Sequence, residues 1–128
     1  METRLRVLGH PVHQTLIVFP MGLLGMSVVF DILYLASGAP ELERVTFWML
    51  AAGILGSLLA APFGLADWLQ TPPGTRAKLT GLLHGGGNLA VLALFALSLW
   101  LRLPERGGAS ELAHLISFVG LGLALTTA

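Results

Sequence analysis

The run LIVFPMGLLGMSVVFDILYLA, residues 16–36, is long and apolar enough to cross a bilayer as a helix. About 20 residues of α-helix, at about 1.5 Å each, cross roughly 30 Å of hydrocarbon. Three similar runs follow, and short segments rich in Pro and Gly separate them. The sequence therefore predicts a polytopic all-α membrane protein, a bundle of four transmembrane helices. Its single domain is residues 1–128, with spans at about residues 16–36, 45–66, 79–101 and 112–128.

The composition agrees with a lipid environment. Of the 128 residues, 55% are hydrophobic and 11% are charged, whereas soluble domains carry roughly 25% charged residues. Mean hydropathy is +0.80. Seven basic residues balance seven acidic ones without a basic run, which argues against a nucleic-acid partner. The absence of cysteine from the sequence excludes disulfides and thiolate metal sites. The expected partner is the lipid bilayer.

The basic residues outside the spans predict the orientation of the chain. Four lie on the side of the N-terminus and three on the other side: Arg4, Arg6, Arg76 and Lys78 against Arg44, Arg102 and Arg106. Because cytoplasmic loops carry the excess of Lys and Arg, we expect both termini in the cytoplasm. The first run lacks a cleavage pattern after it and is expected to stay as a signal anchor.

Ionisable and amide side chains within the spans mark candidate sites, because such groups are costly in a bilayer. If the spans alternate in direction, five of these side chains approach one layer on the cytoplasmic side: His10, His13, Asp67, His84 and Asn88. Asn88 is about 6 Å deeper in the membrane than His84. Asp31 and His114 lie toward the opposite rim, where we expect them to pair with each other or with Arg44 in a structural role. The sequence thus predicts one His/Asp cluster.

Small residues share helical faces with these candidates. On the third span, three- and four-residue spacing places four residues on one helical face: Gly81, His84, Gly85 and Asn88. On the second span, the same spacing aligns five residues: Gly53, Ser57, Ala60, Gly64 and Asp67. Such faces allow close approach of another helix, or of a flat macrocycle beside His84. Asp67 ends its helix, where the dipole disfavours negative charge, so we expect a partner such as His13, His84, Arg76 or Lys78.

Several catalytic motifs lack their context. His84 precedes three glycines, as in a hydrolase oxyanion loop, but the sequence has no G-x-S-x-G elbow. His10 and His13 are spaced as H-x-x-H, without the general-base Glu of H-E-x-x-H. Pro11 between them suits a helix start, so both histidines are also interpretable as helix caps. We expect no catalytic activity of the chain's own.

The motif G-H-P-V-H-Q-T-L-I-V-F-P at residues 9–20, followed by Asp31, Gly64-x-x-Asp67 and His84 with Asn88, resembles the domain of unknown function 2231 family. The resemblance covers nearly the whole chain and implies a small four-span protein of the bacterial inner membrane. Similar domains occur fused to Rieske iron–sulfur domains, which implies redox work. Gln14 stands where the family often has a second proline.

Three functions remain open. In the first, haem b is bound by His13 and His84 as axial ligands, with Asp67 orienting one imidazole and Asn88 nearby, in an electron-transfer role. In the second, His10, His13, Asp67 and His84 bind a transition-metal ion, in a metal site or a permease-like protein. In the third, the chain is a structural accessory subunit of a homo-oligomer or a larger membrane complex, and its histidines are hydrogen-bond partners only.

Overall fold

The computed structural model describes residues 6–104 and 110–127 and is built almost entirely of helices. A short antiparallel hairpin precedes them, with Arg6 opposite Pro11 and Val7 opposite His10. The elements, in order, are β1 (Arg6–Val7), β2 (His10–Pro11), α1 (Val12–Ser37), α2 (Pro40–Gln70), α3 (Arg76–Leu101) and α4 (Glu111–Thr127). The predicted all-α class with four helices is confirmed.

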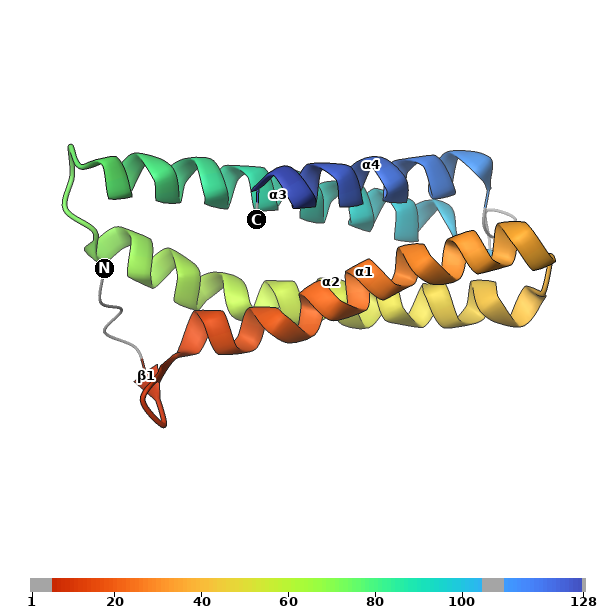
Figure 1. The fold of residues 1–128 in the computed structure, drawn as a ribbon, viewed down its shortest axis with the longest axis horizontal. Coiled ribbons are helices and arrows are strands. Elements are labelled where there is room, and N and C mark those ends of the chain that lie inside the picture. Colours follow the sequence, from red (N-terminus) through yellow and green to blue (C-terminus); the bar gives the residue numbers. More distant parts are fainter. Residues whose placement is uncertain (1–5, 105–109, 128) are drawn as a thin grey trace.

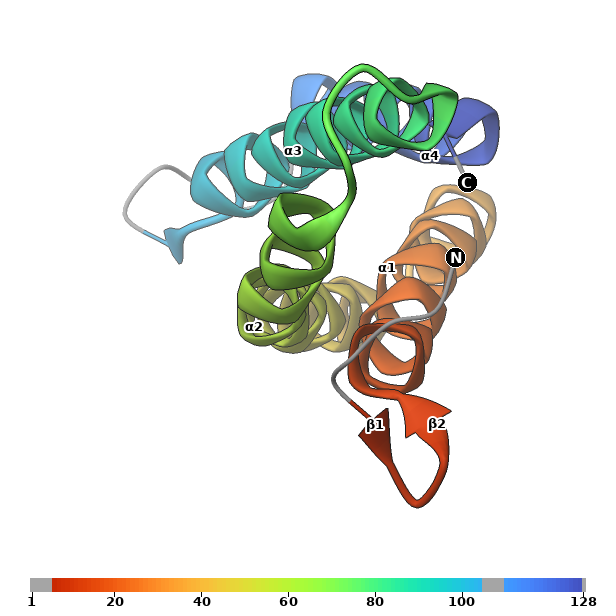
Figure 2. The same ribbon diagram turned by 90° about the vertical axis from the view of Figure 1, so that its left-hand side faces the viewer.

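The four helices form two helical hairpins that pack as two layers. The α1–α2 hairpin makes one layer and the α3–α4 hairpin makes the other (Figure 1). The turn between α1 and α2 and the loop between α2 and α3 lie at opposite ends of the bundle. We call these the turn end and the loop end. Toward the loop end, α1 diverges from the α3–α4 layer, as Figure 2 shows from that side.

Among residues 6–104 and 110–127, three helices are long and apolar enough to cross a membrane. They are α1, α2 and α3, with 26, 31 and 26 residues. The α4 helix, with 17 residues, is shorter and similarly apolar, about 26 Å long at the standard rise. Large apolar side chains such as Phe19, Leu59 and Leu89 are exposed on the outer surface, as lipid contact requires. This arrangement matches the predicted membrane-type bundle.

The helix boundaries differ from the predicted spans mainly at α2. This helix begins at Pro40, five positions before the expected start at residue 45. Proline fits the first helical position because it has no N–H to satisfy, and Glu41 and Glu43 in the first turn complement the helix dipole. Before α2, Gly38 adopts φ +70° and closes α1 by donating from its N–H to the Tyr34 carbonyl at 2.7 Å. Pro11 is the N-cap of α1 instead of its first helical residue.

Glycines of α2 bring α1 and α2 together. A Cβ at Gly53 would lie 2.8 Å from Leu24, one at Gly56 would lie 3.3 Å from Pro20, and Ala60 is fully buried. The predicted small-residue face of α2 is thus confirmed at Gly53 and Ala60, with Gly56 in contact as well. Between the two layers, an apolar core is formed by Leu24, Val28, Leu50, Val91 and Phe95.

Candidate functional site

His13 lies in the first turn of α1 and packs on α2 at the loop end. Its Nδ1 is 3.0 Å from the Ala60 carbonyl oxygen, and because that oxygen can only accept, Nδ1 carries the proton. The ring covers Gly64, where a Cβ would lie 2.8 Å from Cε1 of His13. The glycine face predicted on α2 therefore continues to Gly64, and the imidazole occupies the space that the missing side chain leaves.

Asp67 is one turn beyond Gly64 on the same helix. Its Oδ1 is buried and has no hydrogen-bond partner in the described part of the chain. Lys78, one of its expected partners, donates from Nζ to the Trp68 carbonyl at 2.7 Å and lies 3.8 Å from the centre of the Trp68 ring. The lysine thus neutralises the C-terminal end of α2 through a carbonyl instead of through the carboxylate.

His84 connects α3 to the last turn of α4. Its Nδ1 donates to the Thr127 carbonyl at 2.6 Å, and its Nε2 accepts from Asn88 Nδ2 at 2.9 Å. Asn88 Oδ1 in turn accepts from the Thr127 hydroxyl at 3.3 Å. The predicted proximity of His84 and Asn88 is confirmed, and Thr127 completes a three-residue network.

Glycines around His84 serve two different purposes. A Cβ at Gly81 would meet Trp68 at 2.7 Å, and one at Gly87 would clash with the Thr127 side chain. At Gly85 and Gly86, no atom beyond the adjoining residues and the local helix backbone lies within 4 Å of an added Cβ. Half of this glycine set therefore admits neighbouring helices, and the other half faces open space.

The candidate ligands do not form one metal-binding group. His10 is exposed in the β-hairpin, with Nδ1 3.1 Å from the Leu8 carbonyl oxygen. His13 belongs to the α1–α2 contact and His84 to the α3–α4 contact. Within residues 6–104 and 110–127, no three His, Cys, Asp or Glu side chains are placed to hold a metal ion together. The placement therefore does not support the four-ligand set of His10, His13, Asp67 and His84.

A second polar cluster, not predicted as a site, lies near the turn end. Asp31 of α1 and Arg102, the C-cap of α3, form a bidentate ion pair, with Nη1–Oδ1 at 2.8 Å and Nη2–Oδ2 at 2.6 Å. The side chains are 0% and 2% exposed, respectively. Arg44, the alternative partner expected for Asp31, is exposed and is not its partner; of the two expected pairings, the structure shows the one between Asp31 and His114.

Serines of two helices complete the environment of Arg102. Its Nε donates to Ser98 Oγ at 3.2 Å and its Nη2 to Ser117 Oγ at 3.4 Å. Ser98 also donates to the Ala113 carbonyl at 2.8 Å and lies 2.7 Å from Ser117 Oγ. The guanidinium therefore joins α1, α3 and α4, and it connects the two layers of the bundle.

His114 of α4 borders this ion pair, as its expected pairing with Asp31 suggested. Its Nε2 is 3.7 Å from Asp31 Oδ1, and its ring stacks on Tyr34 with centroids 5.7 Å apart and planes at 22°. Both ring nitrogens are buried without a hydrogen-bond partner in the described structure. We call Asp31, Tyr34, Ser98, Arg102, His114 and Ser117 the turn-end cluster.

The sequence carries a signal for this cluster beyond the expected pairing of Asp31 with His114. Ser98 and Arg102 are four residues apart, and His114 and Ser117 are three apart, so each pair presents polar groups on one helix face. By its position between two spans, Arg102 is predicted to be a loop cation. Because it is buried in an ion pair, it no longer counts toward the orientation rule. Arg4 and Arg106 lie outside the described residues.

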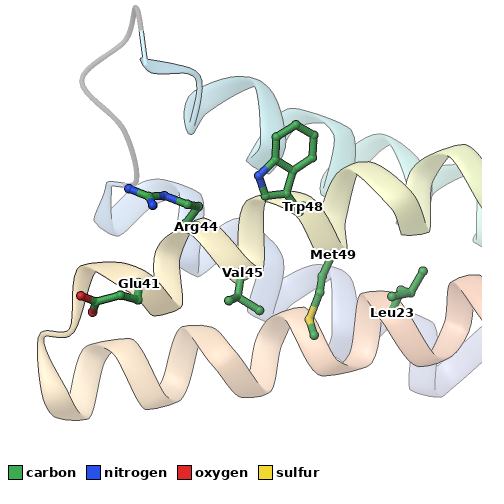
Figure 3. Close-up of a pocket in the computed structure, with 6 residues that line it drawn as sticks. All are labelled: Leu23, Glu41, Arg44, Val45, Trp48 and Met49. Carbon is green, nitrogen blue, oxygen red and sulfur yellow. The ribbon is translucent and has the colours of Figure 1, made fainter.

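A shallow groove on the outer surface contains none of these groups. It runs between α1 and α2 near the turn end and is open to the side, and its six lining residues are shown in Figure 3: Leu23, Glu41, Arg44, Val45, Trp48 and Met49. Its floor is apolar and its charged residues stand at one end. None of the predicted ligands lines it.

Comparison with known proteins identifies the family. The model of the family described as "Predicted membrane protein (DUF2231)" matches residues 9–128. No curated protein and no solved structure matches the chain. The family match begins at the glycine before His10 and includes all four helices, together with the loop-end residues and the turn-end cluster. The chain therefore belongs to the DUF2231 family of predicted membrane proteins.

Proposed function

We propose that this protein is an integral protein of the bacterial inner membrane that binds b-type haem at the loop end and transfers electrons through it. The observation that carries the proposal is the orientation of His13. Its Nδ1–H is held by the Ala60 carbonyl, so the lone pair of a neutral imidazole is on Nε2. Metal-ligating histidines usually have this arrangement, in which one nitrogen donates to a carbonyl and the other binds the metal.

His84 is the second proposed axial ligand. Its Nδ1–H is also held by a backbone carbonyl, that of Thr127, and its Nε2 is engaged only by the Asn88 amide. Ligation requires that Asn88 rotate away. That rotation breaks the 2.9 Å bond to Nε2 and the 3.3 Å bond from the Thr127 hydroxyl. His84 is an exposed residue, so a ligand can approach it from the surface of the bundle.

The two histidines lie in opposite layers at the same end of the bundle, and each imidazole is turned toward the other helix of its own hairpin, so a haem held by both would require at least one ring to reorient. His13 is on α1 and His84 is on α3, in opposite layers, toward the end where α1 diverges from the α3–α4 layer (Figures 1 and 2). Asp67, whose Oδ1 has no hydrogen-bond partner among the described residues, is one turn beyond Gly64, which the His13 ring covers. It is the proposed acceptor for a polar group of the ligand or for a second imidazole.

The visible absorption spectrum tests this proposal. We expect protein purified in mild detergent, after expression with haem precursor, to show a Soret band that shifts on reduction. The band should be lost in His13→Ala and weakened or lost in His84→Ala. His10→Ala is the matched control, because this exposed histidine is bonded only within the β-hairpin. A colourless wild-type protein, or a band that survives both substitutions, contradicts the proposal.

A structural accessory subunit is the second candidate. His13 and His84 each donate to a backbone carbonyl of a neighbouring helix, and these hydrogen bonds favour a structural role. They are enough to explain the two histidines at these positions without a cofactor. In that case the protein carries no haem. Metal analysis of the same preparations distinguishes this function from a transition-metal site, in which a colourless protein retains metal and His13→Ala reduces its amount.

Orientation in the membrane is part of the proposal. Both termini are expected in the cytoplasm, which places the α1–α2 turn in the periplasm and the α2–α3 loop in the cytoplasm. Reporter fusions at Glu41 and Gly74 check this assignment, because these residues lie beside the two connections at opposite ends of the bundle. A cytoplasmic report from Glu41 with a periplasmic report from Gly74 reverses the orientation.

A further inference from the structure

The groove between α1 and α2 combines charged and apolar surface in the order in which a phospholipid presents them. Glu41 and Arg44 stand at its turn end, and Val45, Met49 and Leu23 line it farther along the helices (Figure 3). Large apolar side chains are exposed on all four helices, so the apolar floor alone indicates no ligand. The two charges at one end of that floor distinguish this groove, because they limit what can fill it.

One face of α2 supplies most of the groove. Its lining residues on α2 follow the spacing i, i+3, i+4, i+7 and i+8, which keeps them on one helical stripe: Glu41, Arg44, Val45, Trp48 and Met49. Leu23 closes the groove from α1, whereas Glu43, also in the first turn of α2, does not line it. The volume is about 520 Å³, within the roughly 300–1,000 Å³ of small-ligand sites.

The length of α2 places the two charged residues at the depth of the lipid headgroups. Its 31 residues are about 46 Å long at the standard rise. A bilayer is about 40–45 Å thick with its headgroups, and its hydrocarbon core is about 30 Å thick. The first turn of α2 therefore lies among the phosphate groups. From Glu41 to Met49 the helix advances about 12 Å, so the apolar lining lies beside the acyl chains of one leaflet, about 15 Å deep.

The polar groups of the groove have unused binding capacity. Glu41 and Arg44 are exposed, and neither has an ion-pair or hydrogen-bond partner within residues 6–104 and 110–127. The indole of Trp48 is 65% exposed, and its N–H has no acceptor in the same part of the chain. Figure 3 shows the indole nitrogen on the side of the ring toward Arg44. One cation, one anion and one neutral donor are thus available to a ligand near the membrane surface.

We propose that this groove binds one zwitterionic phospholipid whose headgroup carries a primary ammonium group. Arg44 binds the phosphate through its charge and its N–H groups, and Glu41 accepts from the ammonium. The Trp48 N–H donates to an ester carbonyl, and one acyl chain lies along the apolar lining. An anionic headgroup would bring a second negative charge to Glu41, and a quaternary ammonium has no N–H to donate. The site contains neither His13 nor His84, so it does not depend on the proposed haem.

Native mass spectrometry of lipid-free protein, titrated in mild detergent, tests the headgroup. The probes are phosphatidylethanolamine, phosphatidylglycerol and phosphatidylcholine with identical acyl chains. We expect one phosphatidylethanolamine per chain to bind about fivefold more tightly than phosphatidylglycerol, the factor for one charge contact near a membrane surface. Arg44→Gln should weaken this binding about fivefold, and Glu41→Gln should remove the preference. Arg76→Gln is the matched control, because it removes an exposed cation at the loop end.

Three results would overturn the proposal. The first is equal affinity of wild type for phosphatidylethanolamine and phosphatidylglycerol, and the second is an equal effect of Arg44→Gln and Arg76→Gln. The third is a dimer that lipid does not dissociate but Trp48→Ala does, because a second copy then fills the groove. Since Glu41 and Arg44 are exposed, their variants should keep the stability of wild type in micelles without phospholipid, as checked by circular dichroism.

Fluorescence quenching by lipids with brominated acyl chains locates the bound lipid. Trp48→Phe gives the signal of the other two tryptophans, which is subtracted to leave that of Trp48. In phosphatidylcholine bilayers with increasing brominated phosphatidylethanolamine, half-quenching of Trp48 should require a smaller brominated fraction in wild type than in Arg44→Gln. Identical quenching curves for the two proteins mean that Arg44 does not hold a lipid beside Trp48, and they overturn the proposal.

Discussion

Replacing Arg102 by Gln should strongly destabilise the bundle. The substitution removes both hydrogen bonds to Asp31, at 2.8 and 2.6 Å, and leaves a carboxylate that is 0% exposed without its countercharge. Removing one partner of a buried ion pair typically costs about 3–5 kcal/mol. Since each 1.4 kcal/mol is a factor of ten, the unfolding equilibrium constant should rise by about two to four orders of magnitude.

Unfolding by sodium dodecyl sulfate in mixed micelles, followed by circular dichroism, measures this effect. Arg44→Gln is the matched control: the same change in charge at an exposed position near the same end of the bundle, with an expected effect within about 0.5 kcal/mol. The double variant Asp31→Asn/Arg102→Gln should be more stable than Arg102→Gln alone, because no charge then remains buried without a partner.

Two results would refute the reasoning about this ion pair. If Arg102→Gln and Arg44→Gln differ by less than about 0.5 kcal/mol, the buried pair does not hold the two layers together. If the effects of Asp31→Asn and Arg102→Gln simply add in the double variant, the two side chains do not interact in the folded protein.

The helix contacts at the loop end yield two more predictions. Gly64→Ala should destabilise the α1–α2 contact by about 1–3 kcal/mol in the same unfolding assay, because its Cβ would lie 2.8 Å from the His13 ring. Gly22→Ala is the control: its Cβ would meet no atom of another helix within 4 Å, so the substitution should have little effect. Gly87→Ala should displace Thr127 and speed amide hydrogen exchange in the last turn of α4, and Gly86→Ala should not; equal exchange in both variants would mean that this contact does not hold α4.

Part of the candidate site followed from local patterns. Helical spacing placed Ala60 and Gly64 on one face of α2, and that face receives His13. It also placed Asn88 one turn from His84, where the two side chains are bonded. These relations involve a single helix or the close approach of two neighbours, so the 3.6-residue period is enough to predict them.

Local patterns of this kind could not show whether His13, Asp67 and His84 converge on one site. Alternating spans correctly bring their helix ends to one side of the bundle, but depth says nothing about which way each helix is rotated. Packing within each hairpin fixes that rotation: His13 turns toward α2, and His84 turns toward α4.

Hydropathy and breaker residues in the sequence alone determined that the chain is an all-α membrane protein with four helices, because cost in lipid and helical propensity are properties of short segments. Only the tertiary structure decided which charges meet. Asp31 and Arg102 are 71 positions apart, on different hairpins, and Arg102 follows the last residue of its helix. Their pairing depends on how the two layers pack and how each helix is rotated, and neither property is encoded in a local pattern.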